Sequence, residues 1–491
     1  MFRPLIAGLI VAQLLAFIQV YLANDTMYRA MSAVGEAGYF TVPNRITLPT
    51  LHLFGPAFWG GLFFTLSVGL GVTLCSVAAA WIWMYLLRSS RVAGFLLLLP
   101  LILCILSVNA AGFNLLDSLY FLLIPLTVIL VMQRIMQPLT KSMIWTRIGV
   151  ITVPVVLLAA LLQTTLDSRP FISIRDNLLL SNPVGARVND FYYNFTLYPA
   201  EAFKTLDQKL IKTYRFEEEV DGPVRERLAG LLLAHDYLPI SPAGGPDLDL
   251  VVSDTELLLK KGGRVVLQAG MQDFIEQPET LLKEFSLRTD KHLFFRQYAF
   301  VSIVMCLLLF PYLLVYGLVR LLIRILFGAR LPNPAASIAA AALAVALLGF
   351  SLYDFNQAGS IDSNRLMENL EQAGWRQRVA LIKEITAAGR EVGTLPVYNQ
   401  MLASPNIAER YWLARALGQS RMPETYDDLL SLLNDPQHNV VCMAFYGLGR
   451  RGDKRAIQKI IGRIQSSDHW YEQWYGYRAL KSLGWRQKVI E

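Results

Sequence analysis

Seven long apolar runs dominate this sequence and limit what the chain can fold into. A bilayer core needs roughly 20 apolar residues in α-helical form, and each run approaches or exceeds that length. Of the 491 residues, 54% are hydrophobic and 17% are charged, whereas soluble proteins carry about 25% charged residues. The sequence therefore predicts a mostly α-helical membrane protein with about seven transmembrane helices. The runs are Pro4 to about Ala23, Phe58–Leu87, Val92–Val108, Phe113 to about Met132, Ile148 to about Leu166, Tyr298–Val319 and Ala335–Tyr353.

The first run could belong to a cleavable signal peptide, because Arg3 precedes it. The run is long, however, and the segment from Val20 to Ala23 lacks a small residue at the −3 position. An uncleaved signal anchor is therefore expected. Cleavage would leave six spans and would not change the predicted side of any other segment.

Lys and Arg in the short loops alternate in a way that predicts orientation. All four basic clusters fall on one side of a seven-span zigzag, which the positive-inside rule makes cytoplasmic. The other side carries the uncharged connection from Asn109 to Gly112 and the loop from Asn24 to Pro56. The N-terminus is then cytoplasmic, whereas residues 167–296 and the tail from Asp354 are extracytoplasmic. The clusters are Arg3; Arg88 and Arg91; Arg134, Lys141 and Arg147; and Arg320, Arg324 and Arg330.

The first soluble segment is expected to form a small α+β module. Ala200–Lys212 and Val224–His235 have the pattern of amphipathic helices. Leu248–Val252 alternates like a strand, and Gly262-Gly263 between two apolar runs indicates a hairpin. The expected domains are 1–166 with spans one to five, 167–296 as the α+β domain, 297–353 with spans six and seven, and 354–491 as a repeat domain.

Two groups of polar residues in this module could be functional sites. His235-Asp236 could be an acid–base pair, and Asp247, Asp249 and Asp254 could bind a cation. Adjacent residues on a helix do not face one another, however, and Asp at alternate strand positions usually forms a solvated face. The glycine and terminal glutamate of a calcium-binding loop are also missing. Both groups are therefore interpreted as structural.

The C-terminal segment carries a recurring pattern of about 30 residues, the size of a helical repeat. In each unit a helix ends at a glycine, and a polar turn and a second amphipathic helix follow. Glycine is expected just past a helix end because it enters the left-handed conformation without a Cβ clash. One helix pair cannot cover its own apolar face, so successive pairs must stack into an α-solenoid. The glycines are Gly418, Gly449 and Gly484, with a weaker copy at Gly389.

These units resemble the HEAT-like repeats of the phycobilisome-lyase type, with an acidic turn and a helix ending in Ala-Leu-Gly418. In that pattern an arginine stands eight residues before the glycine. Arg410 matches it, but Val441 and Gly476 do not. The resemblance implies an α-solenoid of HEAT-like repeats and, since most such arrays are protein-binding scaffolds, a protein partner. It gives no ground for a bilin-attachment activity.

Tryptophan and arginine residues of this segment form a candidate partner-binding surface. The sequence Gly-Trp375-Arg376-Gln recurs as Gly-Trp485-Arg486-Gln, and exposed Trp and Arg are typical of binding interfaces. The alternative is that these rings pack between repeats or cap the end of the solenoid. The six candidates are Trp375, Arg376, Trp470, Trp474, Trp485 and Arg486.

The apolar runs hold few polar residues. Ion-coupled transporters place ionisable groups inside their spans, but here only Asp117 stands near the outer end of the fourth run. Gln13 and Gln19 are expected to make interhelical hydrogen bonds. A candidate intramembrane polar site consists of Asn109, Asn114 and Asp117.

Cysteine, histidine and motif content argue against most enzyme classes. The four cysteines offer no disulfide framework and no Cys/His cluster, and the chain has five histidines. Phosphate-binding, zinc-protease, serine-hydrolase and dinucleotide motifs are absent. No catalytic, cofactor-binding or metal-binding residue is therefore predicted, and no cofactor. The net charge of +7 lies mostly beside the spans, so no nucleic-acid partner is expected.

Two functions remain open from the sequence. The first is an integral membrane scaffold, expected in a prokaryotic inner membrane, that binds a protein partner through its extracytoplasmic domains. The second is a component of a transporter or transferase that handles a lipid or other hydrophobic substrate. Its support is the number of spans, because seven exceed what an anchor requires. The sequence names neither the partner, the substrate nor the oligomeric state.

Overall fold

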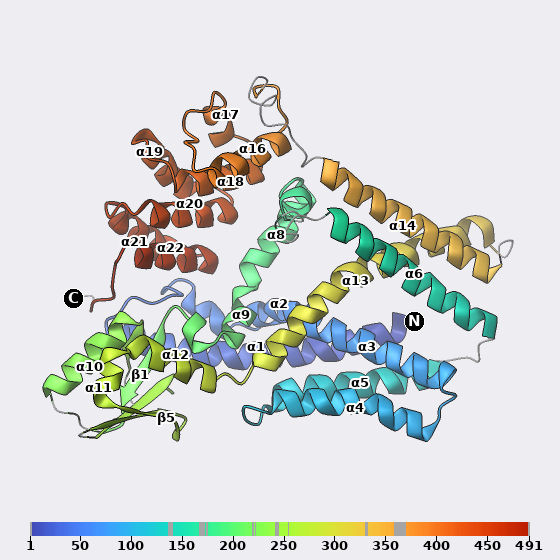
Figure 1. The fold of residues 1–491 in the computed structure, drawn as a ribbon, viewed down its shortest axis with the longest axis horizontal. Coiled ribbons are helices and arrows are strands. Elements are labelled where there is room, and N and C mark those ends of the chain that lie inside the picture. Colours follow the sequence, from blue (N-terminus) through green and yellow to red (C-terminus); the bar gives the residue numbers. More distant parts are fainter. Residues whose placement is uncertain are drawn as a thin grey trace. The chain divides into compact units, whose positions relative to one another are not determined.

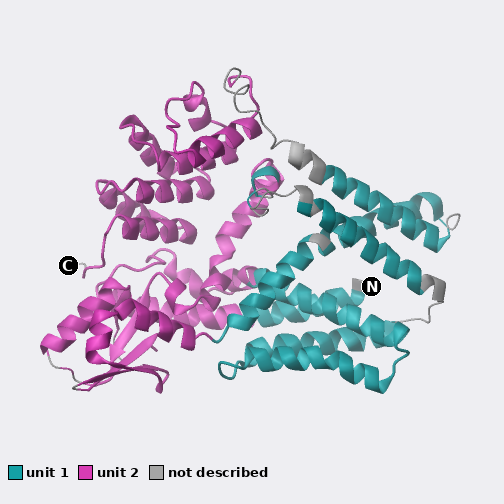
Figure 2. Ribbon diagram, viewed as in Figure 1, with its two compact units in different colours: residues 1–17, 61–177, 291–360 teal, residues 18–60, 178–290, 361–491 magenta. Residues whose placement is uncertain are grey.

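A computed structural model describes residues 2–135, 141–165, 172, 175–218, 220, 222–240, 245–253, 255–328, 332–357 and 370–489. The expected domain border at 166–167 lies outside these residues, and so does most of the link between the last apolar helix and the repeats. The chain divides into two compact units, and each is assembled from separate stretches of sequence (Figure 2). The first unit contains residues 1–17, 61–177 and 291–360, and the second contains 18–60, 178–290 and 361–491.

The first unit consists of long apolar helices. Seven helical stretches in the described part of the chain are long and apolar enough to cross a bilayer, which confirms the predicted number of long apolar helices. The second stretch joins α2 (Phe54–Phe64) and α3 (Leu70–Trp81) through the π-helical turn η2 (Thr65–Gly69) and ends in η3 (Ile82–Leu86). The other helices are α1 (Phe2–Glu36), which continues into the second unit, α4 (Arg91–Val108), α5 (Leu115–Ile135), α6 (Lys141–Thr165), α13 (Leu293–Phe327) and α14 (Asn333–Gln357) (Figure 1).

Small residues bring these helices close together. A Cβ placed on Gly8 of α1 would lie 2.6 Å from Thr73 Cγ2 of α3, so the Thr73 side chain packs against α1 because position 8 is glycine. Thr65 Oγ1 donates a hydrogen bond to Gln13 Oε1 over 2.6 Å. Small-residue contacts and polar links of this kind are the usual means of helix association where no water drives apolar surfaces together. Gln13 therefore makes the interhelical bond that the sequence predicts.

The second unit contains a five-stranded sheet with strand order β2-β1-β3-β4-β5. β1 is parallel to both neighbours, and α10 (Gly222–Ala234) connects it to β2. β3, β4 and β5 form an antiparallel meander. The β4–β5 turn has φ values of 56° at Gly262 and 75° at Gly263, as a two-residue hairpin requires. The strands are β1 (Lys212–Phe216), β2 (Tyr237–Pro239), β3 (Leu248–Val252), β4 (Glu256–Lys261) and β5 (Arg264–Gly270).

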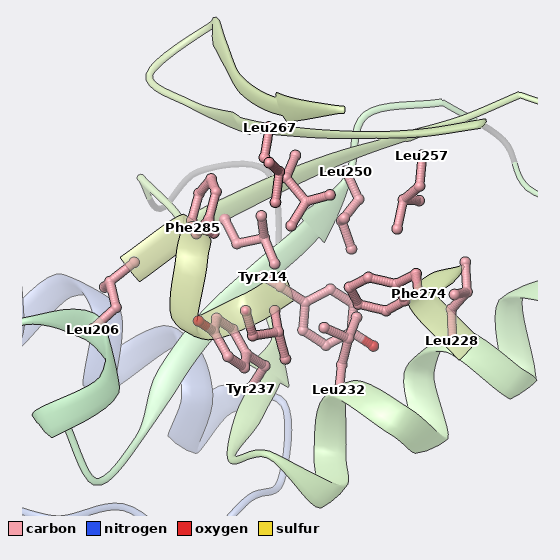
Figure 3. Packing of buried hydrophobic residues seen from close by; sticks show 13 residues of the cluster. Leu206, Tyr214, Leu228, Leu232, Tyr237, Leu250, Leu257, Leu267, Phe274 and Phe285 are labelled. Carbon is pink, nitrogen blue, oxygen red and sulfur yellow. The ribbon is translucent and has the colours of Figure 1, made fainter. Parts of the chain in front are cut away.

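An apolar core joins this sheet to its helices (Figure 3). Leu228 and Leu232 of α10 point toward Tyr214 of β1, and Phe274 and Phe285 complete the cluster from α11 (Met271–Glu276) and α12 (Pro278–Arg288). All of these side chains except Tyr214 are fully buried, and Tyr214 is 3% exposed. Burial of a large apolar side chain contributes about 1.5–3 kcal/mol, so this core is the main stabilising feature of the α+β module.

One helix that the sequence predicts in this module does not form. The sequence predicts a continuous helix over Ala200–Lys212, but α9 (Leu197–Phe203) ends early and β1 begins at Lys212. Between them Thr205 and Gln208 close a capping box around a 3₁₀ turn, which stops helix propagation. β2 was also missed because it has only three residues and ends in proline.

The C-terminal repeats stack through their first helices, which are shown in orange to red in Figure 1. α16 packs on α18, α18 on α20, and α20 on α22. The first helices are α16 (Trp375–Ala387), α18 (Ile407–Leu417), α20 (His438–Arg451) and α22 (Trp470–Ser482), and the second helices are α17 (Tyr398–Leu402), α19 (Glu424–Ser431) and α21 (Ala456–Ser466).

The repeat glycines serve two purposes, and only one was expected. Gly389 and Gly484 have φ values of 65° and 80° just past a helix end, as predicted. Gly418 has an ordinary helical φ of −64°, and Gly449 lies inside α20, so the left-handed interpretation is wrong for these two. A Cβ on Gly418 would lie 2.8 Å from the Gly447 Cα of the next repeat. These glycines let successive helices touch backbone to backbone.

Buried ion pairs also connect successive repeats. Arg378 Nε of α16 donates to Glu409 Oε1 of α18 over 2.5 Å, and Arg410 Nε of α18 donates to Asp435 Oδ2 before α20 over 2.6 Å. The Glu409 side chain is fully buried and that of Asp435 is 4% exposed. Removing one partner of a buried pair costs about 3–5 kcal/mol because the other charge stays uncompensated. The arginine of the repeat pattern thus fixes the next repeat.

We predict that Gly418→Ala destabilises the solenoid by about 1–3 kcal/mol, because its new methyl group forces α18 and α20 apart. Gly462→Ala is the matched control: Gly462 lies in α21 with nothing within 4 Å of its Cβ position. That change should be neutral or stabilise by up to ~1 kcal/mol through helix propensity. The free energy of unfolding of both variants is measured by urea unfolding of the full-length protein in detergent, monitored by the fluorescence of the tryptophans in the repeats. Equal stability of the two variants would contradict the close-contact role.

Candidate functional site

The connection between α21 and α22 is hydrogen-bonded to a loop from the N-terminal part of the chain. Asn44 is 5% exposed, and its Nδ2 donates to the carbonyls of Ile464 and Ser467 over 2.7 and 2.8 Å. Its Oδ1 accepts from the backbone amides of Ile46 and Thr47, both at 3.0 Å. The Asn44 side chain therefore closes its own turn and bonds the α21–α22 connection at the same time.

Two buried glutamines complete this contact. Gln473 Oε1 accepts from the Asn44 amide over 2.9 Å, and Gln473 Nε2 donates to Thr47 Oγ1 over 2.6 Å. Gln487 bonds both the amide and the carbonyl of Phe40, at 3.2 and 2.8 Å. Side-chain amides used in this way satisfy buried backbone groups, which would otherwise cost about 1–3 kcal/mol each. Several buried hydrogen bonds therefore hold the loop against the solenoid.

Three of the six predicted partner-binding residues lie in this contact region. Trp470 is 4% exposed and meets the Tyr198 ring edge-on at 5.0 Å. The ammonium of Lys204 lies over the half-buried Trp474 ring at 5.0 Å. Trp485 meets Phe40 edge-on at 5.9 Å. All three rings contact segments that lie outside the repeats.

The other three predicted residues lie apart from that contact. Trp375 and Arg376 are half-buried at the start of α16, with the guanidinium 5.2 Å from the indole centroid. Arg486 is exposed near the C-terminus. The two copies of the Gly-Trp-Arg-Gln sequence thus lie at the first and last helices of the solenoid and do not form one surface.

The α+β module is bonded to the solenoid through Asp236. Tyr477 Oη and Lys481 Nζ of α22 contact Asp236 Oδ1 over 3.1 and 2.8 Å. Burial and the Lys212 charge lower the pKa of the adjacent His235, so this imidazole is neutral at pH 7. Asp236 therefore has a structural role, in agreement with the sequence interpretation.

The aspartates in and just before β3 are each paired with a cation. Lys209 Nζ lies 2.8 Å from Asp247 Oδ1, and Arg215 Nη2 lies 2.7 Å from Asp249 Oδ1 in the adjacent strand register. Burial works against the Asp247 charge, but Lys209 and a backbone bond outweigh it and lower the pKa of Asp247. These residues are structural as expected, although they are paired rather than solvated, and Asp254 lies outside the described residues.

A cavity of about 450 Å³ lies at the carboxyl ends of β1 and β2. Its lining includes Tyr39, Phe216, Arg225 and Ile240. The Arg225 guanidinium lies 5.7 Å from the Phe216 ring centroid, which is within cation–π range. Carboxyl ends of parallel strands are common ligand positions in α/β sheets, but the antiparallel half of this sheet makes the comparison a partial one.

A row of alternating cations and aromatic rings runs across α16, α18 and α20. We call it the basic–aromatic surface, and it comprises Lys383, Trp412, Arg415, Tyr446 and Arg450, of which Trp412 is buried and Arg450 is exposed. Lys383 Nζ lies 4.5 Å from the Trp412 centroid, and the Arg415 guanidinium lies 5.2 Å from Trp412 and 5.5 Å from Tyr446. Arg450 Nη1 donates to Tyr446 Oη over 3.2 Å. In the part of the chain that the structure describes, Arg415 and Arg450 have no acidic partner.

The predicted intramembrane polar residues do come together. Asn114 Nδ2 donates to Asp117 Oδ2 over 2.7 Å, and Asn109 Oδ1 accepts from the Asn114 amide over 2.7 Å. The sequence analysis missed a fourth member, His292, whose Nδ1 lies 2.9 Å from Asp117 Oδ2. Asp117 is fully buried. The cluster ties the α4–α5 turn to the start of α13, and its hydrogen-bonding groups bond one another.

Residues 395–481 match the family model for HEAT repeats. The C-terminal segment is a HEAT solenoid. The resemblance found in the sequence is thereby confirmed for this part of the chain, and HEAT repeats are helical scaffolds of the protein-interaction type. No curated protein and no solved structure matches the chain.

Sequence reasoning could not have found the residues that hold the loop. Asn44, Gln473 and Gln487 are uncharged, belong to no motif, and lie more than 400 residues apart in the case of Asn44 and Gln473. The one available signal was the density of aromatic residues around position 470, which indicated a contact without naming its partner.

We predict that Asn44→Asp frees the loop from the HEAT solenoid. A carboxylate at this position faces backbone carbonyls with no donor to offer, which costs about 2–3 kcal/mol. Hydrogen exchange of peptides from residues 38–52 should accelerate roughly 30- to 100-fold, since local opening controls exchange there. Asn399→Asp, at an exposed position of α17, is the control and should leave exchange unchanged. Unchanged exchange in Asn44→Asp would contradict the role of Asn44.

Proposed function

We propose that the protein is an integral membrane scaffold whose second unit lies on the extracytoplasmic side and binds a protein partner through the HEAT solenoid. One observation carries the topology. The loop around Asn44, the α+β module and the HEAT repeats belong to one compact unit and are joined by buried and partly buried hydrogen bonds. Segments bonded in this way must share a compartment.

The number of spans agrees with this requirement. Four of the seven apolar helical stretches separate the loop from the α+β module, and two separate the module from the repeats. An even number of crossings returns the chain to the same side in both cases. The alternation of basic loops independently favours the extracytoplasmic side for all three segments, which is the arrangement expected in a prokaryotic inner membrane.

The basic–aromatic surface is the proposed docking site. Residues 370–489 contain 17 Lys and Arg against 11 Asp and Glu, and several of the acidic groups are used in buried pairs between repeats. Arg415 and Arg450 lie beside aromatic rings, a combination that interfaces favour. The partner is therefore proposed to present an acidic segment with apolar or aromatic side chains.

The alternative role in handling a hydrophobic substrate has less support. Its candidate residues, Asn109, Asn114 and Asp117, bond one another and His292, which is the arrangement of a structural turn. The support that remains for this alternative is the number of apolar helices.

We predict that a photo-reactive amino acid at Tyr446 of the full-length protein crosslinks to a single protein in native membranes. Arg415→Glu combined with Arg450→Glu should lower the yield of this adduct about tenfold or more, because like charges repel an acidic partner. Raising the salt concentration should weaken the adduct in the same direction.

The matched control reverses the same amount of charge elsewhere on the solenoid. Lys454→Glu with Lys459→Glu changes two exposed residues near α21 and should leave the adduct intact. Equal loss in both double variants, or no adduct at all, would contradict docking on the basic–aromatic surface.

A further inference from the structure

Three side chains that can ligate a metal converge where the last two HEAT repeats meet. His438 lies at the start of α20, and His469 and Glu472 lie at the start of α22. One donor atom from each lies within 4.8 Å of the others. His469 and Glu472 are three residues apart, a spacing that puts both on the same face of a helical turn.

His469 is the unusual member of this group. The residue is 6% exposed, yet neither ring nitrogen has a hydrogen-bond partner in the described part of the chain. Burial of an unpaired polar group costs about 1–3 kcal/mol, and such groups are rare in folded proteins. A ligand bound by the ring would remove this cost.

The protonation states suit a cation. Burial and the neighbouring His438 lower the pKa of His469 to about 4, so the ring is neutral at pH 7 and retains a lone pair. Burial opposes the charge on Glu472, but His438, Arg463 and Ser467 outweigh it and lower the pKa of this carboxyl group. Two imidazoles and a carboxylate are a ligand set of zinc sites that keep a fourth position open.

We propose that His438, His469 and Glu472 bind a divalent transition-metal ion of the zinc type. Tetrahedral ligands at about 2.1 Å from the ion lie about 3.4 Å from one another. The donors now lie within 4.8 Å of one another, so binding rearranges them and opens the 2.8 Å hydrogen bond between His438 Nδ1 and Glu472 Oε1. The two imidazole rings stack at 3.6 Å with an angle of 14°. Binding turns one ring until both lone pairs face the ion. The His438 side chain is 31% exposed and leaves an entry path and room for a water ligand.

Neighbouring groups orient the carboxylate. Ser467 Oγ and Arg463 Nη2 donate to Glu472 Oε2 over 2.8 and 2.9 Å, while Oε1 faces His438 Nδ1 at 2.8 Å. Oε1 is therefore the oxygen presented to the ion. The nearby Arg463 charge reduces the affinity for any cation, so binding depends on the imidazoles, which favour zinc, cobalt and nickel over calcium and magnesium.

The site is connected to the loop held by the solenoid. The Ser467 carbonyl accepts the hydrogen bond from Asn44, and the Ser467 hydroxyl bonds Glu472. A metal ion on His469 and Glu472 stiffens this connection between α21 and α22. The metal ion would stabilise the second unit whether or not the proposed protein partner binds.

The test uses full-length protein in detergent, purified without a polyhistidine tag and dialysed against a chelator. Titration with Co²⁺ should give visible absorption bands of a low-coordinate nitrogen and oxygen site, and Zn²⁺ should abolish them with one equivalent per chain. His438→Gln and Glu472→Gln should each weaken Zn²⁺ binding roughly 100-fold, because a directly bound ligand is lost. His235→Gln, in the α+β module, is the control and should bind Zn²⁺ as the parent protein does.

Folding is checked separately, because His469 and Glu472 are buried. His438 is partly exposed, so His438→Gln should keep the melting temperature measured in chelator while losing the upward shift that Zn²⁺ produces. A parent protein that binds no stoichiometric Co²⁺ or Zn²⁺ would overturn the proposal. So would a His438→Gln variant that binds Zn²⁺ as tightly as the parent.

Discussion

Hydrogen bonds between distant parts of the chain are the constraint on which the second unit depends. Asn44 bonds the connection between α21 and α22, and Asp236 bonds α22 from the side of the α+β module. Six apolar helical stretches intervene in the sequence between Asn44 and the repeats. A hydrogen bond cannot form across a hydrocarbon layer, so these contacts restrict how the apolar helices can cross one.

The HEAT solenoid can carry such contacts because its repeats are joined in two independent ways. Glycines such as Gly418 and Gly447 bring successive first helices to backbone contact, and buried pairs such as Arg410–Asp435 fix each repeat to the next. The repeat that contains α22 differs from the others, because Trp470 and Trp485 contact Tyr198 and the loop around Phe40 instead of another repeat.

The sequence was informative where a local rule acts and uninformative where a long-range contact decides. Apolar length predicted the seven helices, the Gly262-Gly263 pair predicted the β4–β5 turn, and the repeat period predicted the solenoid. Strand β1 was missed because its Lys and Arg find partners only in the folded sheet. His438 and His469 lie 31 residues apart, so no short spacing indicated that they meet. Gly418 was assigned to the correct place for the wrong reason, because its role depends on the next helix.

Sidedness is the most direct test of this account. The four native cysteines are replaced, and single cysteines are introduced at the exposed positions Ser253, Ser466 and Ser90, the last of which lies between Arg88 and Arg91. Intact cells are then treated with a membrane-impermeant thiol reagent. If the second unit is extracytoplasmic, positions 253 and 466 are labelled on intact cells, and position 90 is labelled only after the membrane is opened. Labelling of 253 without 466 would place the α+β module and the HEAT solenoid in different compartments, and the single second unit would be contradicted.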